Sequence, residues 1–203
     1  MVVEKKYGGI AGYMGYLPSA GNIVVDNCDI IGLTQNSNQV GGIAGYADSS
    51  VGVSAVKNSR IISQGSQVGG IAGYHGTWGN ILSSYVQNTT IEGYSKVGGI
   101  AGETVAGTIV RDYVNADIKA YAHSAGGIIG YLENTNMTAA SYISAKYVCY
   151  VARSTIQGQE KVGGLIGDSS VPLYYQNETS YDNQNVVEAQ IVCDDITSAS
   201  MGI

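Results

Sequence analysis

Carboxylates that could serve as a general acid and a general base occur at two places in the sequence. Asp194 and Asp195 are adjacent near the C-terminal end, and Glu103 and Asp168 end two copies of a short repeated motif. Cleavage of a polysaccharide needs two such groups at a defined separation. Stacked copies would place Glu103 and Asp168 about 10 Å apart, at the far end of the range for an inverting pair. No neighbouring residue is suited to tuning either group as an acid, so we expect solvated surface carboxylates.

Nucleophilic and metal chemistry have less support. The chain has two histidines, His75 and His123, and no nucleophile-elbow motif, so a Ser-His-Asp triad is not indicated. Cys28, Cys149 and Cys193 are far apart, and neither histidine stands at ligand spacing from a cysteine. We interpret the cysteines as small buried apolar residues, with one disulfide plus one free thiol as the alternative. We expect no catalytic residue, no metal site and no cofactor.

The motif that carries Glu103 and Asp168 organises the whole chain. It reads VGGIAGY at residues 40–46 and 68–74, and returns as YGGIAGY, VGGIAGE, AGGIIGY and VGGLIGD. A repeat of a few tens of residues is typical of solenoids, propellers and arrays. The first glycines of the copies are 33, 28, 29, 28 and 37 residues apart, and they are Gly8, Gly41, Gly69, Gly98, Gly126 and Gly163.

A second landmark lies between the motifs. A Val is followed five residues later by an Ile, with polar turn-forming residues such as Asp26 and Asn27 between them. Asn and Asp suit such corners because they tolerate left-handed backbone. One unit is shorter, with four residues from Val114 to Ile118. The regular pairs are Val25 and Ile30, Val56 and Ile61, Val86 and Ile91, Val151 and Ile156, and Val186 and Ile191.

These units predict short β-strands. Gly-Gly pairs disfavour a helix, and the Val, Ile, Thr and Tyr runs suit a pleated surface. We therefore expect an all-β fold, a parallel β-solenoid of about six to seven turns with a repeat of roughly 28–37 residues, forming a rod on the order of 25–30 Å long. The Gly pair would give close backbone approach and positive φ at one corner of every turn. A β-propeller is the alternative, but its blades are usually longer.

The same alignment predicts the interior of the solenoid. One residue per unit would stack as an aliphatic ladder, and the next would form a neighbouring column. The ladder is Ile43, Ile71, Ile100, Ile128 and Leu165, and the column is Ala44, Ala72, Ala101, Ile129 and Ile166.

The chain reads as a single solenoid domain over residues 1–203. Both ends fall near or inside a copy of the motif, so we expect a fragment of a longer repeat array. Insertions fall in the outer units, where loops would lie. The predicted units are 7–40, 41–68, 69–97, 98–125, 126–162 and 163–203.

Composition excludes several partners. The net charge is −6 and charged residues make up 13% of the chain, with no basic stripe. A nucleic-acid ligand needs such a stripe to replace counterions, and an anionic membrane surface is an equally poor partner. No apolar run approaches the length needed to cross a bilayer, so we expect no membrane insertion. The N-terminus also lacks the apolar segment of a signal peptide.

Tyrosines form two columns in the aligned units. Tyr faces offer flat apolar area with a hydroxyl, which suits sugars or extended peptides, and Trp78 is a plausible anchor in a corner. The alternative is that the Tyr columns stack for stability and that Trp78 packs. One column is Tyr13, Tyr46, Tyr74 and Tyr131, and the other is Tyr85, Tyr113 and Tyr150. The predicted ligand-binding residues are Tyr46, Tyr74, Trp78, Tyr131, Tyr85 and Tyr113.

The repeated GG-[IL]-[AI]-G core with its following turn and Ile run resembles the GLUG repeat. That motif occurs in bacterial surface and secreted proteins, including streptococcal immunoglobulin A peptidases and related zinc metalloproteases. The resemblance extends from Tyr7 to Ile203, and the zinc motif His-Glu-x-x-His of the peptidases is absent here. It implies an extracellular, cell-surface origin and a scaffolding or binding role outside any catalytic part.

We therefore predict a non-catalytic structural spacer module of a bacterial surface or secreted protein. The first alternative is an adhesin-type module that recognises a host glycan or host protein through its Tyr columns. The second is a polysaccharide-active enzyme on a β-helix. Because unpaired strand edges invite pairing, we also expect contacts with flanking repeats and end-to-end self-association.

Overall fold

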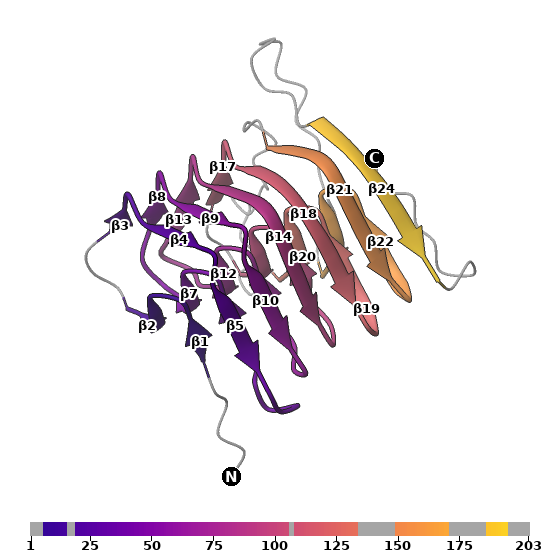
Figure 1. Ribbon diagram of the computed structural model, residues 1–203, viewed down its shortest axis with the longest axis horizontal. Helices are drawn as coiled ribbons and strands as arrows, with labels where there is room; N and C mark the ends of the chain where they lie inside the picture. Colours follow the sequence, from indigo (N-terminus) through magenta and orange to yellow (C-terminus); the bar gives the residue numbers. More distant parts are fainter. Residues whose placement is uncertain (1–5, 16–18, 106–107, 134–148, 171–185, 195–203) are drawn as a thin grey trace.

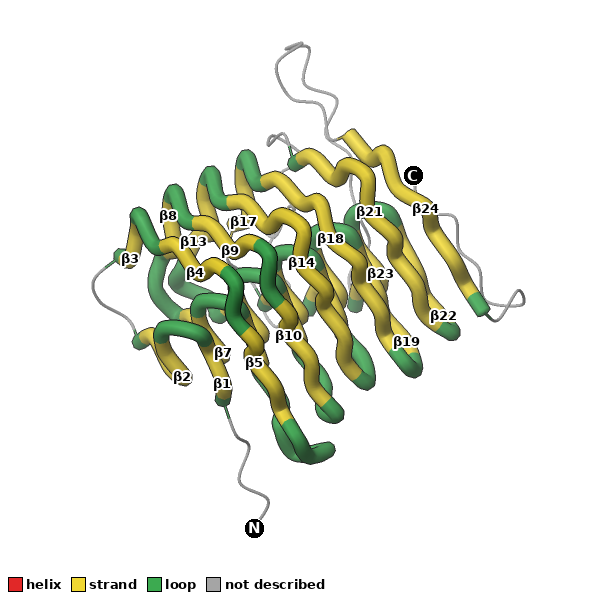
Figure 2. The backbone as a smooth tube through the Cα atoms, viewed as in Figure 1, coloured by secondary structure: helices red, strands yellow, loops and turns green. Residues whose placement is uncertain are grey.

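The computed structural model describes residues 6–15, 19–105, 108–133, 149–170 and 186–194. The chain winds in successive coils that lie side by side from the N-terminal to the C-terminal end (Figure 1). Within the described residues every regular element is a β-strand, so none is an apolar helix of membrane-spanning length (Figure 2). The paired strands run parallel, for example β12 with β7 and β16. The predicted all-β parallel β-solenoid is confirmed.

Each coil contributes short strands to four parallel sheets. The Gly sheet runs β1 (Tyr7–Gly8), β6 (Val40–Gly41), β11 (Val68–Gly69), β15 (Val97–Gly98), β19 (His123–Gly126) and β22 (Glu160–Gly163). The Tyr sheet runs β2 (Ala11–Met14), β7 (Ala44–Ala47), β12 (Ala72–His75), β16 (Ala101–Thr104), β20 (Ile129–Leu132) and β23 (Ile166–Ser169).

The other two sheets are less uniform. The four-stranded sheet runs β3 (Ala20–Gly21), β8 (Val51–Gly52), β13 (Asn80–Leu82) and β17 (Thr108–Val110). The eight-stranded sheet runs β5 (Asp29–Gly32), β10 (Arg60–Ser63), β14 (Tyr85–Gly93), β18 (Tyr113–Ala120), β21 (Tyr150–Gly158) and β24 (Val186–Cys193), with β4 (Val24–Asp26) beside β9 (Ala55–Lys57) and β9 beside β14. Within the described ranges only four turns thus have a strand on every side, fewer than the six to seven expected.

The predicted core columns form inside the coil. The backbone N–H of Ile43 donates to the Ile71 carbonyl and that of Ile71 to Ile100, so equivalent residues stand one above the other. Their side chains are inaccessible to solvent, and Leu165 at the C-terminal end is half-buried. The Ala44 column stacks in the same way, with Ala72 between Ala44 and Ala101.

The glycine pairs permit close approach of neighbouring turns, and they do not supply positive φ as expected. A Cβ at Gly70 would lie 2.1 Å from the Gly99 carbonyl oxygen and 2.6 Å from Cγ2 of Val86. No glycine in the described part of the chain has a positive φ. The second half of the prediction is therefore wrong: steric exclusion, and not backbone conformation, requires glycine at the pair.

Non-glycine residues make the left-handed corners. Asn27, Asn58 and Asn88 have φ of 54°, 49° and 50°, as the Asn-type corner predicted. A second set of left-handed residues precedes the Gly motif and includes Gln67 and Lys96. A third follows the four-stranded sheet and includes Ser83.

A serine directly after a left-handed corner ties consecutive turns together. The Ser84 hydroxyl donates to the Leu82 carbonyl two residues back, and it accepts the Ser54 N–H of the preceding turn at 3.2 Å. The Ser54 hydroxyl likewise donates to the Gly52 carbonyl and accepts the Ile23 N–H. These serines are buried, and the sequence interpretation missed them. Their signal in the sequence is a Ser or Thr directly after several of the left-handed residues, such as Ser59 after Asn58 and Thr89 after Asn88.

We expect Gly70→Ala to lower the free energy of unfolding by about 3 kcal/mol or more, because the added methyl meets backbone on one side and Val86 on the other. Urea unfolding followed by circular dichroism measures this change. Gly52→Ala is the matched control, since its Cβ would lie 3.9 Å from the nearest atom, and it should change stability by less than about 1 kcal/mol. Equal effects would contradict the close-approach explanation.

Candidate functional site

The Tyr column of the Tyr sheet is assembled as predicted. Tyr46 and Tyr74 stack with ring centroids 4.8 Å apart and planes inclined by 20°, and Tyr13 continues the stack at 5.1 Å from Tyr46. The ammonium of Lys6 lies 4.3 Å from the Tyr46 ring centroid. Burial raises the pKa of Tyr46 and of Tyr74. Because neighbouring rings stack face to face, little of each ring face is accessible to a ligand.

Glu103 and Asp168 interrupt this column in register. Glu103 lies between Tyr74 and Tyr131, and Asp168 follows Tyr131. Each carboxylate has a lysine seven residues earlier in its own turn. Lys96 Nζ lies 2.6 Å from Glu103 Oε2, and Lys161 Nζ lies 2.9 Å from Asp168 Oδ2. Each acidic replacement therefore forms an ion pair with a lysine at the adjacent corner of its own coil.

The expectation that both carboxylates are solvated is wrong for Glu103. This side chain is 3% exposed, and it also accepts a hydrogen bond from Gln67 Nε2 at 2.8 Å. A hydrogen bond with Glu103 raises the pKa of the nearby Glu133 carboxyl. The ammonium of Lys96 also lies 4.2 Å from the Tyr131 ring centroid. Glu103 is thus enclosed by polar partners and leaves no room for a substrate beside it.

The remaining predicted contact residues lie on two surfaces. Tyr85, Tyr113 and Tyr150 occupy one register column of the eight-stranded sheet, and the last two rings stack at 5.6 Å. Trp78 is 67% exposed. Trp78 lies in the corner after β12, which also carries Tyr74, whereas Tyr85 lies on β14. The six residues predicted as one ligand set are therefore divided between the Tyr sheet with its following corner and the eight-stranded sheet.

The histidines and cysteines do not form a reactive cluster. His75 is fully buried, its Nδ1 lies 2.9 Å from the Thr104 hydroxyl, and burial lowers its pKa to about 4. Cys149 is buried as expected, and burial raises its pKa to about 12, whereas Cys28 is exposed, contrary to the prediction. Cys193 is half-buried. Across the described ranges, no three His, Cys, Asp or Glu side chains gather as a metal site.

The acidic pair near the C-terminal end is only partly described. Asp194 accepts from Gln157 Nε2 at 3.4 Å, and Asp195 lies outside the described residues.

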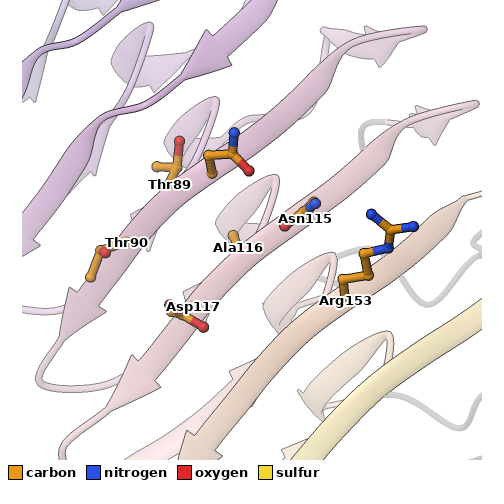
Figure 3. A pocket seen from close by; sticks show the side chains of 7 residues that line it. Thr89, Thr90, Asn115, Ala116, Asp117 and Arg153 are labelled. Carbon is orange, nitrogen blue, oxygen red and sulfur yellow. The ribbon is translucent and has the colours of Figure 1, made fainter.

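A shallow polar hollow on the eight-stranded sheet escaped the sequence interpretation. It holds about 250 Å³ and opens where β14, β18 and β21 run side by side (Figure 3). Thr89 and Thr90 come from β14, Asn115 and Asp117 from β18, and Arg153 from β21. The shortened unit between Val114 and Ile118 was its signal in the sequence.

Comparison with known proteins agrees with this geometry. The family model for the GLUG motif matches residues 64–92, which span one coil from before β11 through most of β14. The resemblance predicted from the repeated Gly core is thereby confirmed in this unit. No curated protein matches the chain.

A solved structure shares the fold. It is the crystal structure of a proposed immunoglobulin A1 protease from Bacteroides ovatus, with a TM-score of 0.53 and 19% identity. The alignment covers 94% of this chain and 66% of that one. At this identity the similarity shows the β-solenoid fold alone.

Asp112 occupies a serine position of the corner ladder. Its Oδ1 accepts the Ser84 N–H at 2.6 Å, the side chain is buried, and Oδ2 has no hydrogen-bond partner. Burial raises the pKa of this carboxyl well above its usual value. An acid whose pKa is raised on folding contributes full stability below the pKa of the unfolded chain, and this contribution is lost as the pH rises through the folded pKa.

We therefore expect Asp112→Asn to increase stability at pH 8 and to leave it nearly unchanged at pH 4, because Asn keeps the acceptor oxygen without the buried charge. Urea unfolding across this pH range tests the sign. The control is Asp29→Asn, which removes an exposed carboxylate paired with Arg60. A variant no more stable than the parent at pH 8 would show that Asp112 is not destabilising when ionised.

Proposed function

We propose that this chain is a non-catalytic structural repeat module that acts as a spacer in a bacterial surface or secreted protein. The main support is the unbroken register of the Gly sheet, in which Gly8, Gly41, Gly69 and Gly98 are successive partners. Each coil buries its apolar residues against the next, so the stack behaves as one stiff body. Such a body suits the holding of other domains at a fixed distance.

The chemistry of the carboxylates supports the non-catalytic part of this proposal. Glu103 is neutralised by Lys96, and Asp168 is paired with Lys161. A glycosidase pair needs one acid and one base facing a substrate, and neither group does so here. The His-Glu-x-x-His zinc motif is also absent from the sequence.

The surface or secreted location rests on relatives. The GLUG match at residues 64–92 and the fold shared with a proposed immunoglobulin A1 protease both support it. Flanking repeats or domains would then be the first partners. The described ends fit this role, because Ile10 is 58% exposed while its equivalent Ile43 is fully buried, and Ile191 is 45% exposed while Ile156 is fully buried.

The spacer role predicts that whole units can be added. Duplicating residues 41–97 after Val97 should insert two coils and lengthen the rod by about 10 Å, because each coil adds one strand spacing. Small-angle X-ray scattering measures the length, and circular dichroism confirms the β-structure. The parent chain should also leave immunoglobulin A1 and polysaccharides uncleaved. The spacer proposal would be overturned if the duplicated chain unfolds. It would also be overturned if the parent chain cleaves immunoglobulin A1 or a polysaccharide and Glu103→Gln abolishes that cleavage.

A second candidate function is adhesion, and the exposure of Trp78 and Tyr13 favours it. Aromatic side chains at 67% and 56% exposure are available to an extended glycan or host protein. The stacking of Tyr46 on Tyr74 then serves as support for this surface.

We expect the combined variant Tyr46→Ala, Tyr74→Ala and Trp78→Ala to lose any binding detected in a glycan-array and host-protein screen of the parent, if this surface is an adhesin site. The variant must keep its β-signal in circular dichroism. Tyr94→Ala, at an exposed tyrosine outside both columns, is the control. Absence of any binding by the folded parent chain would contradict adhesion.

A further inference from the structure

One coil of the solenoid lacks a corner residue that its neighbours have. In β14 the left-handed Asn88 separates Gln87 from Thr89, and in β21 the left-handed Arg153 precedes Ser154. In β18 between them, Asn115 and Ala116 pair with Gln87 and Thr89, so no residue faces Asn88. The register shifts again toward β21, between Val114 and Asp117. The missing residue opens a gap in an otherwise continuous ridge of corners.

The hollow described above fills this gap. Its floor is Ala116, which is 3% exposed and has a smaller side chain than its ladder neighbour Thr89. The Ala116 N–H is already bonded to the Ser154 hydroxyl at 3.1 Å, so the floor backbone is satisfied. Figure 3 shows Asn115 and Asp117 on the strand that crosses the hollow and Arg153 on the next strand. The hollow thus follows from the absence of one corner residue in β18.

The polar groups around the hollow are not engaged with one another. In the described part of the chain, Asn115, Asp117 and Arg153 form no side-chain hydrogen bond and no ion pair. Asn88 donates through Nδ2 to Asn58 Oδ1 at 3.4 Å, which leaves its carbonyl oxygen available. The rim therefore offers a carboxylate acceptor, a guanidinium donor and amides that can do both.

This set fits a neutral polyhydroxylated ligand. Asp117 and Arg153 balance in charge, and the chain carries a net charge of −6, which disfavours a polyanion. Vicinal hydroxyls can donate to Asp117 while they accept from Arg153 and the Asn115 amide. A volume of about 250 Å³ accommodates one pyranose ring.

An aromatic pair begins two residues before Asn115 on β18, on the same outward side as the hollow. Along β18 the exposed positions alternate with buried ones, and Tyr113, Asn115 and Asp117 all point away from the core. Tyr113 stacks on Tyr150 of β21, with planes inclined by 14°. A sugar ring seated at Asn115 would therefore contact the rim of this pair, which combines apolar contact with hydrogen bonding as sugar sites require.

We propose that the hollow between β14, β18 and β21 is a binding site for a neutral pyranose unit of a glycan, recognised through Asp117, Arg153 and Asn115 with Tyr113 at its border. This site lies on the eight-stranded sheet, away from the Tyr46–Tyr74 column. It adds a ligand to the proposed spacer and does not depend on the spacer role.

The test is ligand-observed saturation-transfer NMR on the full chain with methyl pyranosides of glucose, galactose, mannose, N-acetylglucosamine and N-acetylgalactosamine. We expect weak binding of at least one of them, with amide shifts of residues 113–117. Asp117→Ala and Arg153→Ala should each weaken binding at least tenfold. Asp29→Ala and Arg60→Ala, which alter an exposed acid and an exposed base elsewhere on this sheet, are the matched controls and should leave it unchanged.

A filling variant separates the site from folding effects. Insertion of one Asn after Asn115 restores the five-residue spacing between Val114 and Ile118 and supplies the missing corner. This variant should keep its β-structure and its stability while losing the saturation transfer. No transfer to any of the five sugars at millimolar concentration, or binding that survives both the insertion and Asp117→Ala, would overturn the proposal.

Discussion

The backbones of neighbouring coils approach so closely at the Gly-Gly pairs that no side chain fits between them. A Cβ at Gly41 would lie 2.6 Å from the Gly73 backbone nitrogen of the next coil, and a Cβ at Gly42 would lie 2.1 Å from the Gly70 carbonyl oxygen. This contact fixes the turn of each coil and the register of the next one. The Ile43 and Ala44 columns then meet their equivalents above and below without any adjustment. The rest of the solenoid follows from one steric constraint repeated at every turn.

Equivalent residues of successive coils lie side by side. A substitution in one repeat therefore changes the contacts of the same position in the neighbouring coils. A lysine at the corner would stand beside a Tyr column, and two of the coils replace that Tyr with an acid. Lys96 with Glu103 and Lys161 with Asp168 are the results, each separated by seven residues. The first pair is enclosed, and the second is half exposed. A substitution that looked like a candidate catalytic acid thus belongs to an ion pair within its own coil.

The sequence was sufficient for the features that repeat, and insufficient for those that depend on a single side chain. The spacing of the Gly motif predicted the fold class, the Ile43 ladder and the Tyr46 column, and the recurring Val predicted the Tyr85 column. It could not predict that Glu103 is buried, because burial depends on the reach of Lys96 and Gln67 from adjacent corners. Positive φ was assigned to glycine from its general tolerance, whereas the observed left-handed residues are Asn, Gln, Lys, Ser, Arg and Val, many of them bonded through their backbone N–H to a neighbouring turn.

Irregular units carry the features that distinguish one face of a regular solenoid from another. The four-residue gap from Val114 to Ile118 is a small change in sequence, yet the stacking of Asn88 and Arg153 on either side converts it into a hollow. A shorter unit at the end of the stack would leave only a step, because a hollow needs complete coils on both sides. A solenoid can therefore hold a ligand site at no cost to its core, since the deletion removes an outward corner and leaves Val114 and Ile118 buried in their columns.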